Sequence, residues 1–234
     1  MANPLTEGLL ALCAADPEIS ALLGPRLDAA AVLLDKYMDE IEALNPSRGL
    51  VKVSGREELV VKHILDSLAP LGHIVRLSGV PAAGGPAFLR PEFRIADAGS
   101  GAGLPGIPLA ICLPGARISL IERAARRADF LRNAAAVLGL SNVTVEETEM
   151  EKAPPGRFDL VVFRAFRPLE QAVLKGLFRL LAPGGRLAAY KGTREKTEKE
   201  IAGLPPERRE IYPLFVPFLN GERHFVVLGV PFSV

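Results

Sequence analysis

The chain has 234 residues, of which 49% are hydrophobic and 24% charged, which is ordinary for a soluble globular protein with one domain and a small appendage. Its formal net charge of only +1 excludes a globally basic nucleic-acid-binding protein. Any RNA-binding surface must therefore be a local basic patch.

The first residues and the cysteines indicate the compartment. The N-terminal apolar run lacks a basic start and is interrupted by Glu7, which argues against a signal peptide. No stretch reaches the roughly 18 uninterrupted apolar residues of a membrane helix. Cys13 and Cys112 show neither CxxC spacing nor a neighbouring histidine cluster. We therefore expect a cytoplasmic protein with no metal site, no disulfide framework and no membrane partner.

Helical spacing of apolar residues characterises the chain before residue 90. One helix is predicted from about Pro25 to Leu44, because Pro25 suits a first helical turn and Asn45-Pro46 suits a helix end. Its expected apolar face consists of Leu27, Ala31, Leu34, Met38, Ile41 and Leu44. A second helix fits Glu57–Leu68, and a loop is predicted at Gly84-Gly85-Pro86 and Pro91.

After residue 90 the pattern changes to an alternation of strands and helices. Five apolar runs predict strands: Phe93–Ala98, Arg117–Ile121, Val143–Glu146, Leu160–Phe163 and Arg186–Lys191. Helices are predicted to start near Pro105 and to span Ala124–Leu138 and Leu169–Leu181, and Gly184-Gly185 to turn into the fifth strand. This alternation implies an α/β fold with a parallel sheet covered on both faces. It divides the chain into a helical N-terminal extension, residues 1–90, and a sheet domain, residues 91–234.

The last part of the chain departs from this alternation. Two strand-like runs, Ile211–Phe218 and His224–Val230, are joined by Leu219-Asn220-Gly221-Glu222. Asn-Gly between apolar runs is a strong hairpin signal. An antiparallel pair is therefore expected to close the parallel sheet.

The most informative stretch is the glycine-rich turn within Asp97–Gly106 (DAGSGAGLPG), which follows a strand and opens a helix. Gly99, Gly101 and Gly103 allow unusual backbone dihedrals and leave room for a ligand to approach the backbone. In this setting the pattern predicts a nucleotide-like ligand.

Three features favour S-adenosyl-L-methionine over a dinucleotide. Asp97 precedes the glycines and suits the amino-acid part of that cofactor or an ordered water beside it. Glu122 ends the second strand and can accept hydrogen bonds from both ribose hydroxyls. A terminal hairpin replaces the second parallel half of a dinucleotide fold. The alternatives are an oxidoreductase, glycines that serve only the turn, and Glu122 as a solvated charge. Met150-Glu151 follows the third strand and can hold the adenine, or it belongs to an exposed acidic loop.

Five short motifs recur in an order and spacing that one family shares: His63–Leu68 (HILDSL), Asp97–Ile107 (DAGSGAGLPGI), Arg164-Ala165-Phe166, Lys191-Gly192 and Gly221–His224 (GERH). Together they resemble the bacterial small-subunit ribosomal RNA guanine-N7 methyltransferases, the glucose-inhibited division protein B family. The resemblance covers roughly residues 30 to 230. It implies a class I adenosylmethionine-dependent methyltransferase fold, which is Rossmann-like, and methyl transfer to N7 of a guanine in 16S ribosomal RNA. The expected partner is small-subunit ribosomal RNA or a ribosomal particle.

The resemblance also implies roles for matching residues. Gly99 and Leu104 match cofactor-contacting positions of the glycine-rich loop. Met150-Glu151 falls where the family contacts the adenine, and Arg164 where it touches the cofactor pocket.

Other matching positions are implied to face substrate RNA or the active site: His63, Lys191 and Arg223. The chain departs from the family at Gly49-Leu50-Val51, where Asn-Leu-Thr is frequent, and at Glu149, where an arginine is common. Both departures concern the expected RNA-facing surface and lie outside the cofactor motif.

Methylation of guanine N7 makes modest chemical demands on a protein. N7 holds an in-plane lone pair and no proton, so no general base is required, and catalysis reduces to alignment and charge placement. Arg164 and Lys191 end the fourth and fifth strands, where Arg164 can contact the guanine or the pocket wall and Lys191 a phosphate. The alternative for each is a surface charge. Phe163 and Phe166 offer faces for base stacking, although the core is favoured for Phe163. His63 suits a core position as well as an RNA contact.

Two other functions compete with this interpretation. The same cofactor can serve a methyltransferase that acts on a small molecule or a protein, which the near-neutral charge favours slightly. A noncatalytic adenosylmethionine-binding or ribosome-assembly module is the other alternative. A methyl-transfer assay on ribosomal particles separates the first interpretation from both.

Overall fold

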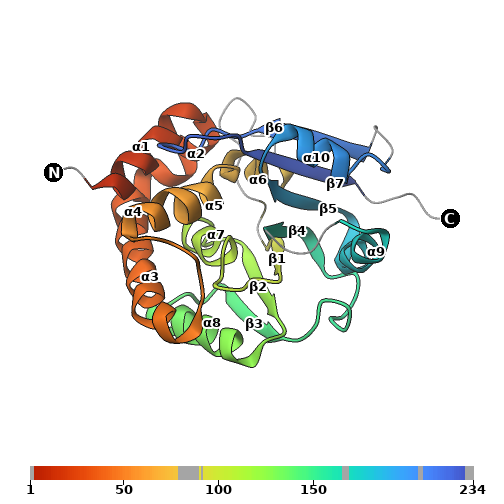
Figure 1. Ribbon diagram of the computed structural model, residues 1–234, viewed down its shortest axis with the longest axis horizontal. Helices are drawn as coiled ribbons and strands as arrows, with labels where there is room; N and C mark the ends of the chain where they lie inside the picture. Colours follow the sequence, from red (N-terminus) through yellow and green to blue (C-terminus); the bar gives the residue numbers. More distant parts are fainter. Residues whose placement is uncertain (1–2, 79–89, 91, 165–168, 205–207, 230–234) are drawn as a thin grey trace.

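A computed structural model describes residues 3–78, 90, 92–164, 169–204 and 208–229 and contains one mixed sheet of seven strands (Figure 1). The strands are β1 (Arg94–Ala98), β2 (Arg117–Glu122), β3 (Val143–Glu147), β4 (Phe158–Arg164), β5 (Leu181–Lys191), β6 (Arg209–Pro213) and β7 (His224–Gly229). Their order across the sheet is β3-β2-β1-β4-β5-β7-β6. The first five strands are parallel, and β7 inserts antiparallel between β5 and β6.

The helices fall into an N-terminal group and a group that connects the strands. The N-terminal group comprises α1 (Pro4–Ala15), α2 (Pro17–Leu23), α3 (Leu27–Arg48), α4 (Arg56–Leu59), α5 (Asp66–Leu68) and α6 (Leu71–Leu77). A π-helical turn, Val60–Leu65, joins α4 to α5 in one continuous helical segment. The connecting helices are α7 (Gly106–Cys112), α8 (Ala125–Val137), α9 (Gln171–Leu180) and α10 (Arg194–Glu200). No helix among these described elements is long and apolar enough to cross a membrane.

The sheet separates two apolar cores because alternate residues of its strands face opposite sides. On β4, Leu160 and Val162 belong to the core shared with the N-terminal helices, α7 and α8. Val161 and Phe163 belong to the core under α9. In Figure 1 the N-terminal helices, red to orange, accordingly lie on one side of the sheet and α9 on the other. The expected parallel sheet with helices on both faces is confirmed.

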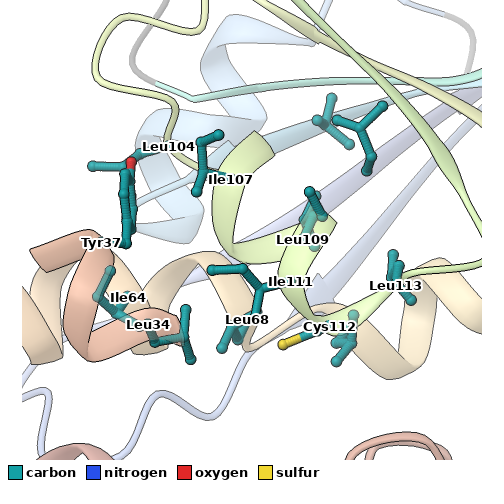
Figure 2. Close-up of a cluster of buried hydrophobic side chains, with 14 of the residues drawn as sticks. Leu34, Tyr37, Ile64, Leu68, Leu104, Ile107, Leu109, Ile111, Cys112 and Leu113 are labelled. Carbon is teal, nitrogen blue, oxygen red and sulfur yellow. The ribbon is translucent and has the colours of Figure 1, made fainter. Parts of the chain in front are cut away.

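The N-terminal helices pack directly on the first connecting helix of the sheet domain. Figure 2 shows Leu34 and Tyr37 of α3 and Leu68 of α5 beside Ile107 and Ile111 of α7, and all five are buried. Burying a side chain of this size contributes about 1.5–3 kcal/mol. The Tyr37 hydroxyl also donates to the Ala102 carbonyl over 2.6 Å. The helices before residue 90 therefore fix the position of the loop that follows β1.

The end of α3 differs from the prediction. The helix does not stop at Asn45-Pro46 but continues to Arg48, with Pro46 inside its last turn. Gly49, at φ +59°, supplies the left-handed residue that ends the helix, and its amide donates to the Asn45 carbonyl. Pro46 has no N–H to donate to the Glu42 carbonyl, so the last turn lacks that hydrogen bond, and the helix ends two residues later. At the other end, Pro25 lies in a short 3-10 turn, Gly24–Arg26, before α3 begins.

The terminal antiparallel pair is confirmed, but its predicted bounds are wrong. β6 ends at Pro213 instead of Phe218, and Leu214 N donates to Arg223 O to close a longer connection. The chain then leaves the sheet, and a turn follows in which the Leu219 amide donates to the Val216 carbonyl. Asn220-Gly221 therefore lies within a loop and not at a tight two-residue turn.

Two further differences concern predicted turns. β5 begins at Leu181, so Gly184-Gly185 forms an irregularity within a strand instead of a turn before one. The loop predicted at Gly84-Gly85-Pro86 and Pro91 lies outside the described residues.

Candidate functional site

The glycine-rich turn crosses from the end of β1 to the end of β2. The amides of Gly99 and Ser100 both donate to the Ile121 carbonyl, at 2.9 and 3.1 Å. The φ angles of Gly99, Gly101 and Gly103 are +73°, +59° and +87°, a left-handed region that glycine adopts without penalty. The predicted need for glycine at these three positions therefore has a backbone cause.

Gly101 and Gly103 serve different purposes. A Cβ on Gly103 would lie 2.6 Å from Ile107 Cγ1 and 2.9 Å from Leu131 Cδ2, so this glycine allows helix packing. A Cβ on Gly101 would meet one atom within 4 Å, the Gly99 carbonyl oxygen at 3.9 Å. The turn therefore presents an uncrowded backbone face at Gly101, where a ligand can approach.

Asp97 is fully buried at the end of β1. Its Oδ2 accepts a hydrogen bond of 2.9 Å from the amide of Gly106, the first residue of α7. Its Oδ1 has no hydrogen-bond partner among the described residues. Burial raises the pKa of Asp97 to about 7. A buried acceptor without a partner is costly, and a donor from a bound ligand would satisfy it.

Glu122 is buried at the end of β2, beside the turn. Its Oε2 accepts from the Gly101 amide and its Oε1 from the Ala124 amide, both at 2.9 Å. Each carboxylate oxygen retains a second acceptor position. Glu122 thus orients the turn and can still accept two hydroxyl groups. The uncrowded Gly101, the unpartnered Asp97 Oδ1 and the fixed Glu122 carboxylate together fit the adenosylmethionine predicted from sequence.

The segment after β3 is held by α9. Met150 is buried, and a Cβ on Gly176 of α9 would lie 2.8 Å from Met150 Cε. Arg179 Nη2 donates to the carbonyls of Met150, Glu151 and Ala153 at 3.3, 2.8 and 2.6 Å. Since the Met150 side chain packs into the core, an adenine contact here would use its backbone or Glu151. The adenine role of both residues, like that of the buried Leu104, stays a prediction.

A second cluster lies at the end of β4 and joins three distant segments of the chain. Arg164 Nη1 donates to Asp66 Oδ2 at 2.9 Å and to the Lys62 carbonyl at 3.2 Å. Arg223, which precedes β7, donates from Nε to Asp66 Oδ1 at 2.9 Å. Asp66 and His63 come from the helical segment with the π turn, a distortion that is frequent at functional sites. The structure therefore brings together three of the four residues expected to face RNA or the active site: His63, Arg164 and Arg223.

His63 is uncharged in this cluster. Burial, together with the Arg164 charge, lowers the pKa of His63 to about 4. Arg164 Nη2 lies 3.1 Å from His63 Nδ1, and a guanidinium can only donate, so Nδ1 accepts and Nε2 carries the hydrogen. His63 thus offers one N–H donor to a partner.

Lys191 lies on the other face of the sheet. Arg164 is the register partner of Tyr190, so the next residue, Lys191, points to the opposite side. Its ammonium group is 2.8 Å from both carboxylate oxygens of Glu200 and 6.0 Å from the centre of the Phe163 ring. The structure does not place Lys191 with the other expected residues. Phe163 is buried in the core, and Ala165-Phe166 lies outside the described residues.

The two departures from the family pattern have local roles. Gly49 ends α3 in the left-handed conformation, as described above. Glu149 pairs with Lys152 over 3.1 Å in the turn after β3. Among the described residues, no group of three or more His, Cys, Asp or Glu side chains is arranged to hold a metal ion.

Sequence reasoning missed Asp66 as a member of the site. A carboxylate inside the apolar run Ile64–Leu68 was the available signal, because a buried charge requires partners. Tyr190 was also missed, and its hydroxyl donates to the Ser67 carbonyl over 3.0 Å. It ties the helical segment to β5 beside the cluster.

Comparison with known proteins places this arrangement in context. A family profile described as rRNA small subunit methyltransferase G matches residues 31–226. A ribosomal RNA small subunit methyltransferase G from Treponema denticola is 40% identical over 218 residues, covering 85% of this chain and 86% of the relative. The protein of the same name from Stenotrophomonas maltophilia is 39% identical over 209 residues, covering 88% of this chain and 90% of the relative.

Solved structures share the fold at low sequence identity. A tRNA methyltransferase from Aquifex aeolicus superposes with a TM-score of 0.52 at 14% identity, covering 72% of this chain and 69% of that protein. A ribosomal protein L11 methylase from Lactobacillus delbrueckii gives a TM-score of 0.51 at 18% identity, with coverages of 75% and 80%. Both likenesses concern the fold alone.

Proposed function

The chain belongs to the rRNA small subunit methyltransferase G family, and from that membership we propose how its residues transfer a methyl group to N7 of a guanine in 16S ribosomal RNA. The enzyme is an S-adenosyl-L-methionine-dependent methyltransferase with a Rossmann-like sheet. The assignment of its residues to cofactor and RNA is our proposal.

The cofactor is assigned to the carboxyl ends of β1 and β2. The backbone of Gly99–Gly103 would lie against it, with the uncrowded face of Gly101 as the closest approach. Asp97 Oδ1 would accept from its amino group, and Glu122 would accept from the ribose hydroxyls. Leu104 and the Met150-Glu151 segment are assigned to its adenine side. When bound, S-adenosylmethionine supplies a methyl group activated by a positively charged sulfur.

The RNA is assigned to the cluster at the end of β4. Guanine N7 carries a lone pair and no proton, so the residues here need to align the base and not to remove a proton. Neutral His63 would donate from Nε2, and Arg164 and Arg223 would present guanidinium donors to oxygen atoms of the target nucleotide. His63, Asp66 and the two arginines have a net charge of +1, which suits a nucleic-acid ligand. Lys191, held by Glu200 on the other face, is assigned to a more peripheral RNA contact.

The observation that carries the proposal is the convergence of both clusters on the carboxyl edge of β1 and β4, which are neighbouring strands. The test is methyl transfer from labelled S-adenosylmethionine to small-subunit particles that lack the modification, followed by mapping of the methylated nucleotide. We expect one guanine to be labelled at N7. Labelling of a protein or a small molecule in place of RNA would overturn the proposal.

We further propose an assembled particle in the cytoplasm as the substrate, instead of isolated RNA. With a net charge of +1, few phosphate contacts are expected, so RNA binding should weaken only slightly as salt concentration rises. The slope of the logarithm of the binding constant against the logarithm of salt concentration is about −0.7 to −0.9 for each neutralised phosphate. The helices before residue 90, proposed as a separate extension, would then dock on the particle. Turnover on particles should exceed turnover on a short oligonucleotide of the same sequence. Equal turnover on both would assign specificity to local sequence and remove the docking role.

A further inference from the structure

Asp66 is a buried carboxylate that connects two arginines from distant parts of the chain. Its side chain is 6% exposed, and each of its oxygens accepts from one guanidinium, Oδ2 from Arg164 and Oδ1 from Arg223. The arginines lie 98 and 157 positions away along the sequence. One carboxylate thereby fixes the spacing between the end of β4 and the start of β7.

Stability alone is a weak explanation for such a group. Taking charges out of water is costly, and buried ion pairs are often replaced by apolar residues without loss of stability. The carboxylate lies among fully buried apolar residues of the same helical segment, Ile64, Leu65 and Leu68. An apolar side chain would therefore suit this position if packing were the requirement. The carboxylate instead specifies the positions of two cationic side chains.

The two guanidiniums differ in how many of their donors are engaged. Arg164 is 13% exposed and also donates to the Lys62 carbonyl and to His63. Arg223 is 29% exposed, and its hydrogen bonds to described residues use Nε for Asp66 and Nη1 for the Glu222 carbonyl. Its Nη2 therefore retains two N–H groups for a ligand. Of the two arginines, Arg223 is the one presented outward.

We propose that Asp66 is a positioning residue that holds Arg223, and with it Arg164, in the orientation that contacts oxygen atoms of the target nucleotide. It does not contact RNA itself and acts through the two guanidiniums. This inference rests on the proposed function, since it assigns those guanidiniums to RNA. A shift of about 1 Å in such a group can reduce turnover about a hundredfold.

The test compares Asp66→Asn with Asp159→Asn. Asparagine keeps the size of aspartate, but its NH₂ group cannot accept a hydrogen bond, so one arginine loses its partner. Asp159 also bridges two arginines, Arg90 and Arg94, but at the amino edge of the sheet. We expect Asp66→Asn to lower kcat/KM on small-subunit particles about a hundredfold while the Kd for S-adenosylmethionine stays within a few fold. Asp159→Asn should retain the turnover of the unmodified enzyme.

A double-mutant cycle with Arg223→Ala separates positioning from a general structural effect. Asp66→Asn should add little to the loss already caused by Arg223→Ala, because the remaining amide oxygen can still accept from Arg164 once Arg223 is gone. Multiplication of the two losses would overturn the proposal, as would full activity of Asp66→Asn. A parallel loss of adenosylmethionine binding in Asp66→Asn would also overturn it, since that would indicate damage to the whole site.

A spectroscopic measurement keeps the proposal testable if the enzyme proves inactive on ribosomal particles. The Nε–H of Arg223 donates to a buried carboxylate and should give a slowly exchanging nuclear magnetic resonance signal. That signal should disappear in Asp66→Asn and persist in Asp159→Asn. Its persistence in Asp66→Asn would overturn the positioning role, whereas absent methyl transfer by the unmodified enzyme would overturn the proposed function alone.

Discussion

Asp66 and Asp159 each bridge two arginines, at opposite edges of the same sheet, and the two bridges differ in burial. At the amino edge, Arg90 and Arg94 are 48% and 45% exposed, so each ion pair with Asp159 is close to water. Exposed pairs of this kind contribute about 0.2–1 kcal/mol. At the carboxyl edge Asp66 and its partners are largely removed from water. A carboxylate between two guanidiniums thus contributes to surface stability at the amino edge and to fixed geometry at the carboxyl edge.

One glycine at each edge of the sheet allows the same comparison. Substituting these two glycines should give the largest difference, which is in adenosylmethionine binding. Gly101→Val should abolish adenosylmethionine binding, because its side chain would occupy the uncrowded face of the turn. Gly156→Val is the matched control: Gly156 precedes β4 at the amino edge, has φ +72°, and also has open space around it. Left-handed backbone costs a non-glycine residue about 1–2 kcal/mol in both variants. Calorimetric titration should show binding lost only in Gly101→Val, and normal binding there would mean that the turn does not hold the cofactor.

Removal of one arginine at each edge should give the next largest difference, which is in methyl transfer to small-subunit particles. Arg223→Ala is expected to lower kcat/KM on small-subunit particles by about a hundredfold, because the guanidinium assigned to RNA is lost. Arg94→Ala, which breaks a pair with Asp159, should leave turnover unchanged and lower the melting temperature slightly. Cofactor affinity should stay within a few fold in both variants. A loss of cofactor affinity in proportion to activity in Arg223→Ala would show that Arg223 belongs to the cofactor site.

Cofactor affinity should depend on pH through a carboxyl-edge group. Burial raises the pKa of Asp97 to about 7, whereas an ionised Asp97 is the form that attracts the ammonium group of the cofactor. Binding should therefore release a proton near pH 7, and affinity should rise about tenfold between pH 6 and pH 8. The amino edge should contribute nothing in this window. Burial would raise the pKa of Asp159, but hydrogen bonds from Arg94 lower it to about 2.

Calorimetry in buffers of different ionisation enthalpy measures this proton release directly. Asp97→Asn should bind more weakly and without the pH dependence. Affinity rises with pH because the raised pKa leaves Asp97 protonated in the free protein below pH 7. Ligand binding must then remove that proton. An affinity that is constant from pH 6 to pH 8 in the unmodified protein would remove Asp97 from the cofactor site.

The smallest effect is expected for the residue on the other face of the carboxyl edge. Lys191→Ala should reduce methyl transfer only a few fold, because its ammonium group is already paired with Glu200. Lys199→Ala, which removes an exposed pair with Glu195, is the matched control and should not change activity. An effect of Lys191→Ala as large as that of Arg223→Ala would place Lys191 within the RNA site.

Sequence alone predicted the parts of the fold that depend on local pattern. Apolar runs identified all seven strands, and the glycine-rich turn identified the carboxyl edge of β1. The predicted end of α3 was wrong because Gly49, and not Pro46, ends the helix. That end depends on the backbone angles of one residue. The predicted length of β6 was wrong because the chain leaves β7 after Leu214, although the apolar run continues to Phe218.

The composition of the site was less accessible to prediction because it depends on long-range register. Arg164 and Lys191 both end strands, and the sequence around them does not indicate that their side chains face opposite sides of the sheet. That distinction appears only when Arg164 is paired with Tyr190, one position before Lys191. Asp66 was missed for a related reason, since its partners come from β4 and from the residue before β7.

The insertion of β7 between β5 and β6 has a consequence for folding during synthesis. Asp66 emerges 157 residues before Arg223, a delay of about 8–30 s at ordinary translation rates. Once Lys191 completes β5, that strand has no neighbour on its outer side until β7 is made, because β7 is the last of the described strands in the sequence. The cluster at the end of β4 is completed in the same step that covers this edge. A newly made molecule thus acquires its proposed RNA contacts and loses its exposed sheet edge together, so partly synthesised chains should be inactive and prone to aggregation.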